Sequence, residues 1–334
     1  MLGRDDIGVD FGTSTCLVTI KGRGIALREP ALCAVDKNTR NILAVGDDAI
    51  SMLGRVPPNI VLVRPLKHGS VSDYDITMRM FRYYLRKSQG RRNVFRPRAF
   101  LCLPGSLTDV ELRSLSDAIL DAGARRTQVI DSAIASALGA GLDVTNSYGH
   151  MIVDIGGGIT DIAVIARGRV VARDSTRPGG DRFSEAIARV VRRKHSIVIG
   201  ERTADEIKLT MGDLTKKTDT PMQMSVTGRN LALGLPRTVL VKSNELASEM
   251  EEVAQEIAEG IHIVLENTLP ELAADIFEHG ITLTGGGALL PGLSDLLGAQ
   301  LKVPFRVPSD PQTAAAVGLS YVMDNLEGLE SIFR

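Results

Sequence analysis

Two short stretches of this chain, about half a chain apart, repeat one pattern and limit the possible folds more than any other feature. Each contains an apolar run typical of a β-strand, an aspartate, a turn of small residues and a second apolar run, at residues 7–20 and 152–165. Glycines in such a turn let backbone N–H groups approach an anion, and the aspartate can hold a hydrated divalent cation beside it. The repeat predicts two related domains that grip one nucleotide between them.

A third strand with a glycine cluster lies near the C-terminus, where residues 281–284 precede Gly285, Gly286 and Gly287. Three consecutive glycines disfavour a strand interior. Each glycine stretch taken singly is also consistent with an ordinary turn. The three together favour a nucleotide site, in which the third cluster meets the nucleoside or its α-phosphate.

The two halves also share an order of elements. In the first half, a strand at residues 99–103 precedes a helix that begins with the capping box Thr108 and Glu111 and ends at Gly123. In the second half, the strand before the third glycine cluster precedes a helix that opens near Pro291. This order predicts a duplicated α/β fold with each sheet covered by helices. A long amphipathic helix is predicted with Ser243 as its N-cap.

Length and composition exclude several classes of protein. A chain of 334 residues fits two domains, and a net charge of −1 argues against a dedicated nucleic-acid binder. The three cysteines and five histidines are scattered, which predicts neither a zinc site nor a disulfide framework. We see no signal peptide and no apolar run that could span a bilayer, so we expect a cytoplasmic protein.

Further stretches along the chain carry a family resemblance. They include Glu29 with Pro30, and residues 21–25, 44–46, 52–55, 64–67, 139–142, 179–181, 199–204, 235–236, 271–276 and 283–290. Over essentially its whole length the chain resembles the bacterial actin MreB family. The resemblance implies an actin-like (ribonuclease H-like) duplicated α/β fold with two lobes and four subdomains around a nucleotide cleft.

The resemblance also implies subdomain boundaries and partners. Subdomain IA is expected at residues 1–31, 65–142 and 311–334, IB at 32–64, IIA at 143–179 and 237–310, and IIB at 180–236. Family members bind ATP (or ADP) with magnesium and form filaments with further copies of themselves. These filaments lie on the inner face of the cytoplasmic membrane, where they organise cell-wall elongation proteins and cell shape. No nucleic-acid partner is expected.

Site residues are carried over from the family position by position. Phosphate contacts are expected from Gly12, Thr13, Ser14 and Thr15 and, on the opposite side, from Gly156, Gly157 and Gly158. Magnesium is expected to be held through water by Asp10 and Asp154. The ribose and adenine are expected against Glu201, Asp205, Lys208, Gly285, Gly286, Gly287 and Ala288. Without the family, Glu201, Asp205 and Lys208 would be taken for the solvated face of a helix.

The sequence departs from the family at the positions that serve ATP hydrolysis. Family members have a Glu-Glu-Pro segment whose second glutamate orients the attacking water, and a threonine after the glycine loop that assists it. Here these positions hold Ser132 and Ile159. We therefore expect weakened hydrolysis, unless Asp131, Thr160 or Asp161 substitutes for the missing groups.

Membrane contact is expected at Val94 and Phe95, where the family has a protruding apolar loop. Nearby basic residues suit anionic lipid headgroups, namely Arg86, Lys87, Arg91, Arg92, Arg96 and Arg98. A solvated basic surface with Phe95 packed inward is the alternative.

Two other functions stay open from the sequence. A regulatory or scaffold relative that does not polymerise is compatible with the altered hydrolytic positions. A small-molecule kinase of the same superfamily is less favoured, because the matching stretches point to the filament-forming family.

Overall fold

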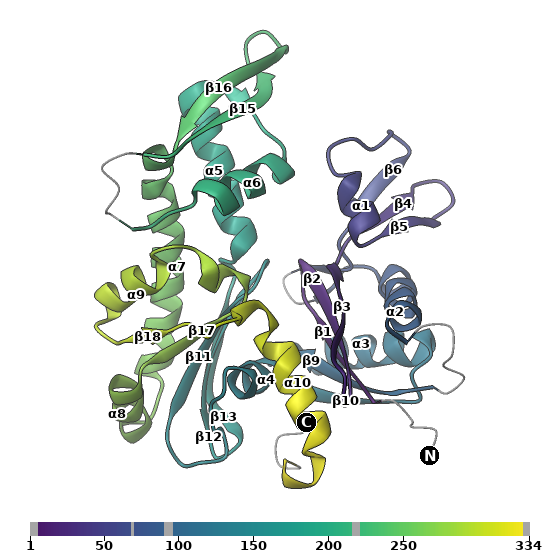
Figure 1. The fold of residues 1–334 in the computed structure, drawn as a ribbon, viewed down its shortest axis with the longest axis vertical. Helices are drawn as coiled ribbons and strands as arrows, with labels where there is room; N and C mark the ends of the chain where they lie inside the picture. The colour runs from purple at the N-terminus through teal and green to yellow at the C-terminus, as the bar shows by residue number, and fades with distance from the viewer. Residues whose placement is uncertain (1–5, 68–69, 90–95, 216–220, 330–334) are drawn as a thin grey trace.

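The computed structural model describes residues 6–67, 70–89, 96–215 and 221–329. The chain folds into two lobes that stand side by side (Figure 1). Within the described residues, each lobe is built on a five-stranded sheet, with strand order β10-β9-β1-β2-β3 in the first and β13-β12-β11-β17-β18 in the second. In both sheets an antiparallel hairpin is followed by a third antiparallel strand, and the remaining two strands are parallel to the first. The repeat in the sequence is therefore a repeat of topology.

The first lobe is built on its five-stranded sheet with helices on both faces, and β7 and β8 pair in a separate two-stranded sheet. Its elements are β1 (Ile7–Phe11), β2 (Thr15–Ile20), β3 (Gly24–Pro30), β7 (Leu66–Lys67), β8 (Ser70–Val71), α2 (Tyr74–Gln89), β9 (Arg98–Leu103), α3 (Asp109–Ala122), β10 (Arg126–Asp131), α4 (Ser132–Gly139), η3 (Pro311–Thr313), α10 (Ala314–Asp324) and η4 (Leu326–Gly328). Buried residues of α2 and α3 pack on one face of the sheet. The predicted capping box is present at α3, where the Thr108 hydroxyl accepts from the Glu111 N–H and the Glu111 carboxylate accepts from the Thr108 N–H.

The second lobe repeats this plan and includes the 20-residue helix α7. Its elements are β11 (His150–Ile155), β12 (Thr160–Ala166), β13 (Arg169–Thr176), α5 (Gly180–His195), α6 (Glu201–Met211), η1 (Ser243–Glu245), α7 (Ala247–Glu266), α8 (Pro270–His279), β17 (Ile281–Thr284), η2 (Gly286–Leu289), α9 (Leu293–Leu301) and β18 (Phe305–Arg306). Helices α5, α7 and α9 bury their apolar faces in one core with the sheet.

The long helix begins later than the sequence predicts. Ser243 opens a 3₁₀ turn and α7 starts at Ala247, so the prediction of Ser243 as its N-cap is wrong. The Ser243 hydroxyl instead accepts a hydrogen bond from the Met222 N–H at 3.0 Å. A tertiary contact thus uses the side chain that was expected to cap the helix.

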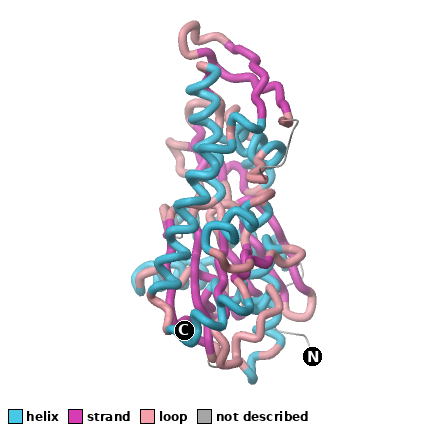
Figure 2. Tube along the Cα trace, turned by 90° about the vertical axis from the view of Figure 1, so that its left-hand side faces the viewer, coloured by secondary structure: helices cyan, strands magenta, loops and turns pink. Residues whose placement is uncertain are grey.

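Each lobe carries an insert at its upper end (Figure 1). The first contains β4 (Cys33–Asp36), β5 (Ile42–Val45), α1 (Asp47–Ser51) and β6 (Ile60–Val63), and the second contains β14 (Ile197–Val198), β15 (Gln223–Asn230) and β16 (Pro236–Lys242). Figure 2, a side view, shows strands of the second insert standing at the top of the molecule. Because β16 pairs with β15 along its length, this sheet continues past the boundary expected at residue 236.

Helices α4 and α10 lie between the two sheets and join the lobes (Figure 1). Their buried side chains form a third core with residues of both sheets. The two helices cross closely at Gly139 and Gly318, where an added Cβ would lie 1.8 Å from the carbonyl oxygens of Ala314 and Ala135 respectively. Glycine is required there because no side chain fits between the two backbones.

Candidate functional site

A cavity of about 660 Å³ lies between the lobes. Its walls come from the turns that the sequence repeat predicts, together with the starts of α5 and α10 and one face of α6. The predicted residues that line it are Asp10, Gly12, Thr13, Ser14, Thr15, Ser132, Asp154, Gly156, Gly157, Gly158, Ile159, Asp161, Asp205, Lys208, Gly285, Gly286 and Gly287.

The β1–β2 and β11–β12 turns are built alike. In the first, the Gly12 N–H donates to the Thr15 carbonyl at 3.0 Å. In the second, the Gly156 N–H donates to the Ile159 carbonyl at the same distance of 3.0 Å. Each turn connects two antiparallel strands of its own sheet. Residues of both turns line the cavity, so the equivalent ends of the two sheets face the cleft.

The two turns meet each other across the cleft. A Cβ added to Gly157 would lie 1.9 Å from Ser14 Oγ, and one added to Gly158 would lie 3.0 Å from Thr13 Oγ1. A Cβ at Gly157 would displace Ser14 and one at Gly158 would crowd Thr13, so glycine lets the two loops form one concave surface of backbone and hydroxyl groups. Such a surface suits a polyanion.

Two carboxylates lie behind these loops. Burial, and then the charge of Asp154, raise the pKa of Asp10 to about 7. Burial likewise raises the pKa of Asp154 to about 6, although Ser136 donates a hydrogen bond to its Oδ2 at 2.6 Å. The two ionised forms disfavour each other, so a divalent cation would be attracted to the site. Hard oxygen ligands of this kind fit magnesium.

Asp161 is the centre of a small hydrogen-bond network at the start of α4. Ser132 Oγ donates to Asp161 Oδ2 at 2.8 Å, and Ser175 Oγ donates to Asp161 Oδ1 at 2.7 Å. Burial raises the pKa of Asp161, and the hydrogen bonds from Ser175 and Ser132 partly offset this rise. Ser132, Asp161 and Ile159 all line the cavity.

The other two positions considered for hydrolysis are turned elsewhere. The Asp131 carboxylate pairs with Arg173 at 2.5 Å and accepts from the Ala133 N–H at 3.1 Å, which caps α4. Thr160 is buried and donates to the Pro178 carbonyl at 2.6 Å. Neither Asp131 nor Thr160 lines the cavity.

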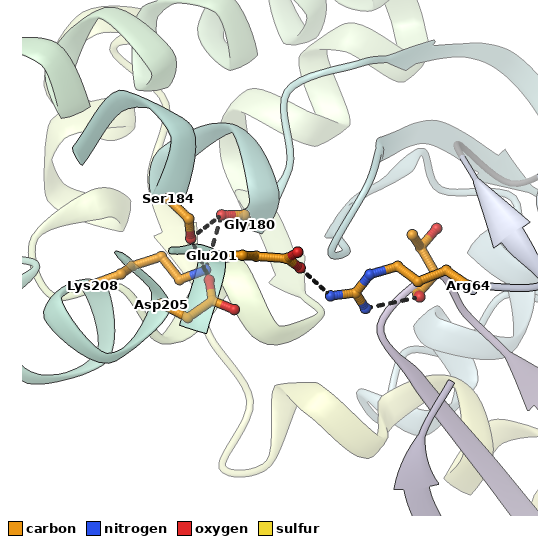
Figure 3. Close-up of polar contacts among 7 residues, drawn as sticks. Arg64, Gly180, Ser184, Glu201, Asp205 and Lys208 are labelled. Atoms are coloured by element: carbon orange, nitrogen blue, oxygen red, sulfur yellow. Dashed lines mark hydrogen bonds and ion pairs between the residues drawn. The ribbon is translucent and has the colours of Figure 1, made fainter. Parts of the chain in front are cut away.

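A polar cluster of α5 and α6 forms the side wall (Figure 3). Lys208 Nζ lies 3.0 Å from Asp205 Oδ1 and donates to the Gly180 carbonyl at 2.9 Å and to Ser184 Oγ at 2.7 Å. These contacts hold the cation of Lys208 and the carboxylate of Asp205 at the cavity wall.

Two residues predicted to meet the nucleoside do not line the cavity. Glu201 lies at the cleft rim and pairs with Arg64 of the opposite lobe at 2.5 Å (Figure 3). Ala288 is buried in the core of the second lobe, beneath the glycines.

Gly285 lines the cavity and must be a glycine. It has a φ of +79°, and a Cβ there would lie 2.4 Å from Asp154 Oδ1.

Several lining residues were not anticipated. Asp181 lines the cavity and directly follows the glycine pair at the start of α5. That glycine pair is a sequence signal from which Asp181 could have been predicted as a site residue. Burial raises the pKa of Asp181. Arg28 and Gln312 also line the cavity and are hydrogen-bonded to each other, although 284 positions separate them. No local pattern predicts such a pair.

The expected membrane loop cannot be placed in the fold. Val94 and Phe95 lie outside the described residues. Among the residues that the structure describes, no helix is long and apolar enough to cross a bilayer.

Comparison with known proteins places the chain in a family. The family model described as MreB/Mbl protein matches residues 4–331. The chain belongs to the MreB/Mbl family. It is 40% identical to the cell shape-determining protein Mbl of Bacillus cereus over 97% of each chain. It is 41% identical to the cell shape-determining protein MreB of Escherichia coli, covering 94% of this chain and 92% of that protein.

Solved structures of similar proteins confirm the fold. MreB 5 of Spiroplasma citri bound to AMPPNP matches with a TM-score of 0.93 and 29% identity, over 99% of each chain. The chain of a MamK double helical filament matches with a TM-score of 0.80 over 96% of this chain, although only 19% of residues are identical. The predicted actin-like α/β fold is therefore confirmed.

Proposed function

We propose that this MreB/Mbl-family protein binds ATP with magnesium in the cleft and assembles into filaments that determine cell shape. The observation that carries the proposal is the close approach of Gly157 to Ser14 across a cavity that the Asp10 and Asp154 carboxylates also line. Support comes from relatives named as cell shape-determining proteins and from similar MreB 5 structures bound to AMPPNP and ADP.

The residues at the cleft fit a magnesium nucleotide. The Gly12–Thr15 and Gly156–Gly158 turns would bind the phosphates, and Asp10 and Asp154 would hold the cation through water. Magnesium, when bound, offsets the negative charge of the phosphates and of this carboxylate pair. Lys208 and Asp205 would contact the nucleoside from the side wall, where Gly180 and Ser184 hold Lys208 in place.

Filament formation follows from closure of the cleft. A nucleotide held by both loops fixes the lobes relative to each other. Each subunit then presents the same two ends to its neighbours, and a head-to-tail contact that does not close gives a filament. We propose that these filaments lie against the cytoplasmic membrane, with Val94 and Phe95 as the contact, and organise cell-wall elongation proteins there.

Hydrolysis is proposed to be weak. The Ser132 hydroxyl is committed to Asp161, and Ile159 has no polar side-chain atom that could orient water. Both oxygens of Asp161 already accept hydrogen bonds from Ser132 and Ser175. Loss of a positioned acid–base group typically slows a reaction by roughly 10²–10⁴-fold.

One preparation tests binding, assembly and turnover together. We expect calorimetry to detect ATP binding that depends on magnesium, and we expect sedimentation to recover the protein in the pellet only with both present. Soluble protein that nevertheless binds nucleotide would favour the regulatory or scaffold alternative. Absence of any nucleotide uptake would refute the proposal.

The hydrolysis proposal has its own variant. We expect the double variant Ser132→Glu with Ile159→Thr to release phosphate faster than the parent protein, whereas Ile159→Val, which keeps an apolar side chain, should match the parent. A parent protein that already releases phosphate as fast as the double variant would show that the serine and isoleucine do not limit hydrolysis.

The membrane contact is tested by pelleting with anionic liposomes, compared between the parent protein and Phe95→Ser. Equal pelleting of the two proteins would refute the proposed contact at Phe95.

A further inference from the structure

An ion pair reaches from one lobe to the other beside the cavity (Figure 3). Arg64 follows β6 of the first insert, and Glu201 is the first residue of α6 on the opposite lobe. The Arg64 Nη2 lies 2.5 Å from Glu201 Oε1. Because 137 positions separate the two residues, their pairing depends on how the lobes stand relative to each other.

The same guanidinium also touches a phosphate loop. Arg64 Nη1 donates to the carbonyl of Thr13 at 3.4 Å, a long hydrogen bond, within the first glycine turn. The planar guanidinium presents donors in fixed directions, so one group can bond to the loop and to Glu201 at once. Its charge also reaches Asp181 at the start of α5, where it favours the ionised carboxylate. Arg64 thus connects the first phosphate loop to two acidic groups of the second lobe.

Burial differs between the two partners in a way that indicates their roles. The Arg64 side chain is 17% exposed, whereas that of Glu201 is 52% exposed. Arg64 is therefore the mostly buried partner, which contacts the Thr13 loop without lining the cavity, and Glu201 reaches it from the rim. An ion pair with a solvent-exposed partner contributes little to the stability of the whole protein. Its effect is therefore expected on the equilibrium between the open and closed cleft, because the pair forms only when the lobes are close together.

We propose that Arg64 and Glu201 form a latch that slows the release of nucleotide, with Arg64 as the residue that positions the Thr13 loop. A nucleotide gripped by both lobes can leave only when they separate, and separation breaks the pair. Glu201 then acts on the rim and does not contact the ribose. The inference rests on the proposed function, because it requires nucleotide in the cavity.

The rate of nucleotide release tests the latch. The probe is etheno-ADP, which carries its label on the base and cannot be hydrolysed at a γ-phosphate. Protein loaded with it and magnesium, below the concentration at which it pellets, is mixed with excess ADP and the fall in fluorescence is followed. We expect release to be about 3-fold faster in Glu201→Gln and up to about 10-fold faster in Arg64→Gln, which loses both contacts.

Two comparisons separate the latch from other roles. The double variant Arg64→Gln with Glu201→Gln should release nucleotide no faster than Arg64→Gln alone, because residues that act as one pair are not additive. The effect of Glu201→Gln should shrink in about 0.5 M salt, which screens an exposed pair. Arg40→Gln is the matched control, since Arg40 pairs with Asp73 within the first lobe.

The outcomes distinguish the latch from the proposed function. If the parent protein binds etheno-ADP and Glu201→Gln releases it at the parent rate, the latch is wrong and nucleotide binding stands. Additive effects of the two substitutions would assign Glu201 to a direct nucleotide contact and overturn the latch as well. If the parent protein takes up no nucleotide, both the latch and the proposed function fail. Because Glu201 is on the surface, its variant carries the test even if Arg64→Gln does not fold.

Discussion

Replacement of Asp10 by asparagine should stabilise the nucleotide-free protein at pH 8. Burial and the charge of Asp154 raise the pKa of Asp10 from 3.8 to about 7, so the folded state binds a proton that the unfolded state releases. The free energy of unfolding therefore falls as the pH rises from about 4 to about 7, and it stays lowered above that. At about 1.4 kcal/mol per pH unit, this raised pKa lowers the free energy of unfolding, relative to its value below pH 4, by on the order of 4 kcal/mol at pH 8 and about 1.6 kcal/mol at pH 5.

Asparagine has nearly the same shape and carries no charge, so Asp10→Asn avoids this cost. An unfolding entropy of roughly 2 cal/mol/K per residue converts the stabilisation at pH 8 into a rise in Tm of about 6 °C. Thermal unfolding followed by circular dichroism, without nucleotide, should show this rise at pH 8 and a smaller one at pH 5. With ATP and magnesium the order should reverse, because the amide no longer holds the cation.

The control for this prediction is a neighbouring aspartate with a partner. Asp131→Asn removes the carboxylate that faces Arg173 across 2.5 Å, and breaking such a buried pair costs about 3–5 kcal/mol. This variant should lower the Tm at both pH values. If Asp10→Asn proves no more stable than the parent protein at pH 8, the charge repulsion inferred for the cleft is not there.

The remaining predictions concern glycines and a helix cap. Gly157→Ala places a Cβ 1.9 Å from Ser14 Oγ, so Ser14 must be displaced when the lobes close and calorimetry should show at least about a 10-fold loss of nucleotide affinity. Gly318→Ala places a Cβ 1.8 Å from the Ala135 carbonyl and should lower the free energy of unfolding in urea by about 3 kcal/mol. Thr108→Ala removes the capping box of α3 and should cost about 1 kcal/mol in the same urea titration.

Matched variants show whether space, and not the loss of glycine itself, causes these effects. An added Cβ at Gly200 meets no atom within 4 Å, so Gly200→Ala should leave nucleotide affinity unchanged. Val317 is an exposed neighbour on α10, and Val317→Ala should leave the urea midpoint nearly unchanged. Equal losses in the controls and in Gly157→Ala or Gly318→Ala would contradict the steric explanation.

The sequence alone determined the parts of this protein that short segments encode. The repeated strand–aspartate–glycine units predicted two equivalent sheets and the turns that face each other in the cleft. The capping box at Thr108 predicted the start of α3, because its hydrogen bonds join residues three positions apart. Ser243 shows the limit of such reasoning, since its hydroxyl binds the Met222 N–H and does not cap α7.

Only the tertiary structure decided which side chains the cavity contains and how they are paired. Asp131 and Ser132 are adjacent in the chain, yet the first faces Arg173 and the second faces Asp161. Arg64 and Glu201 meet only because the two lobes stand on either side of one cleft. Periodicity and glycine spacing specify backbone geometry over a few residues. The partner of a charged side chain depends on the distance between segments that the whole fold brings together.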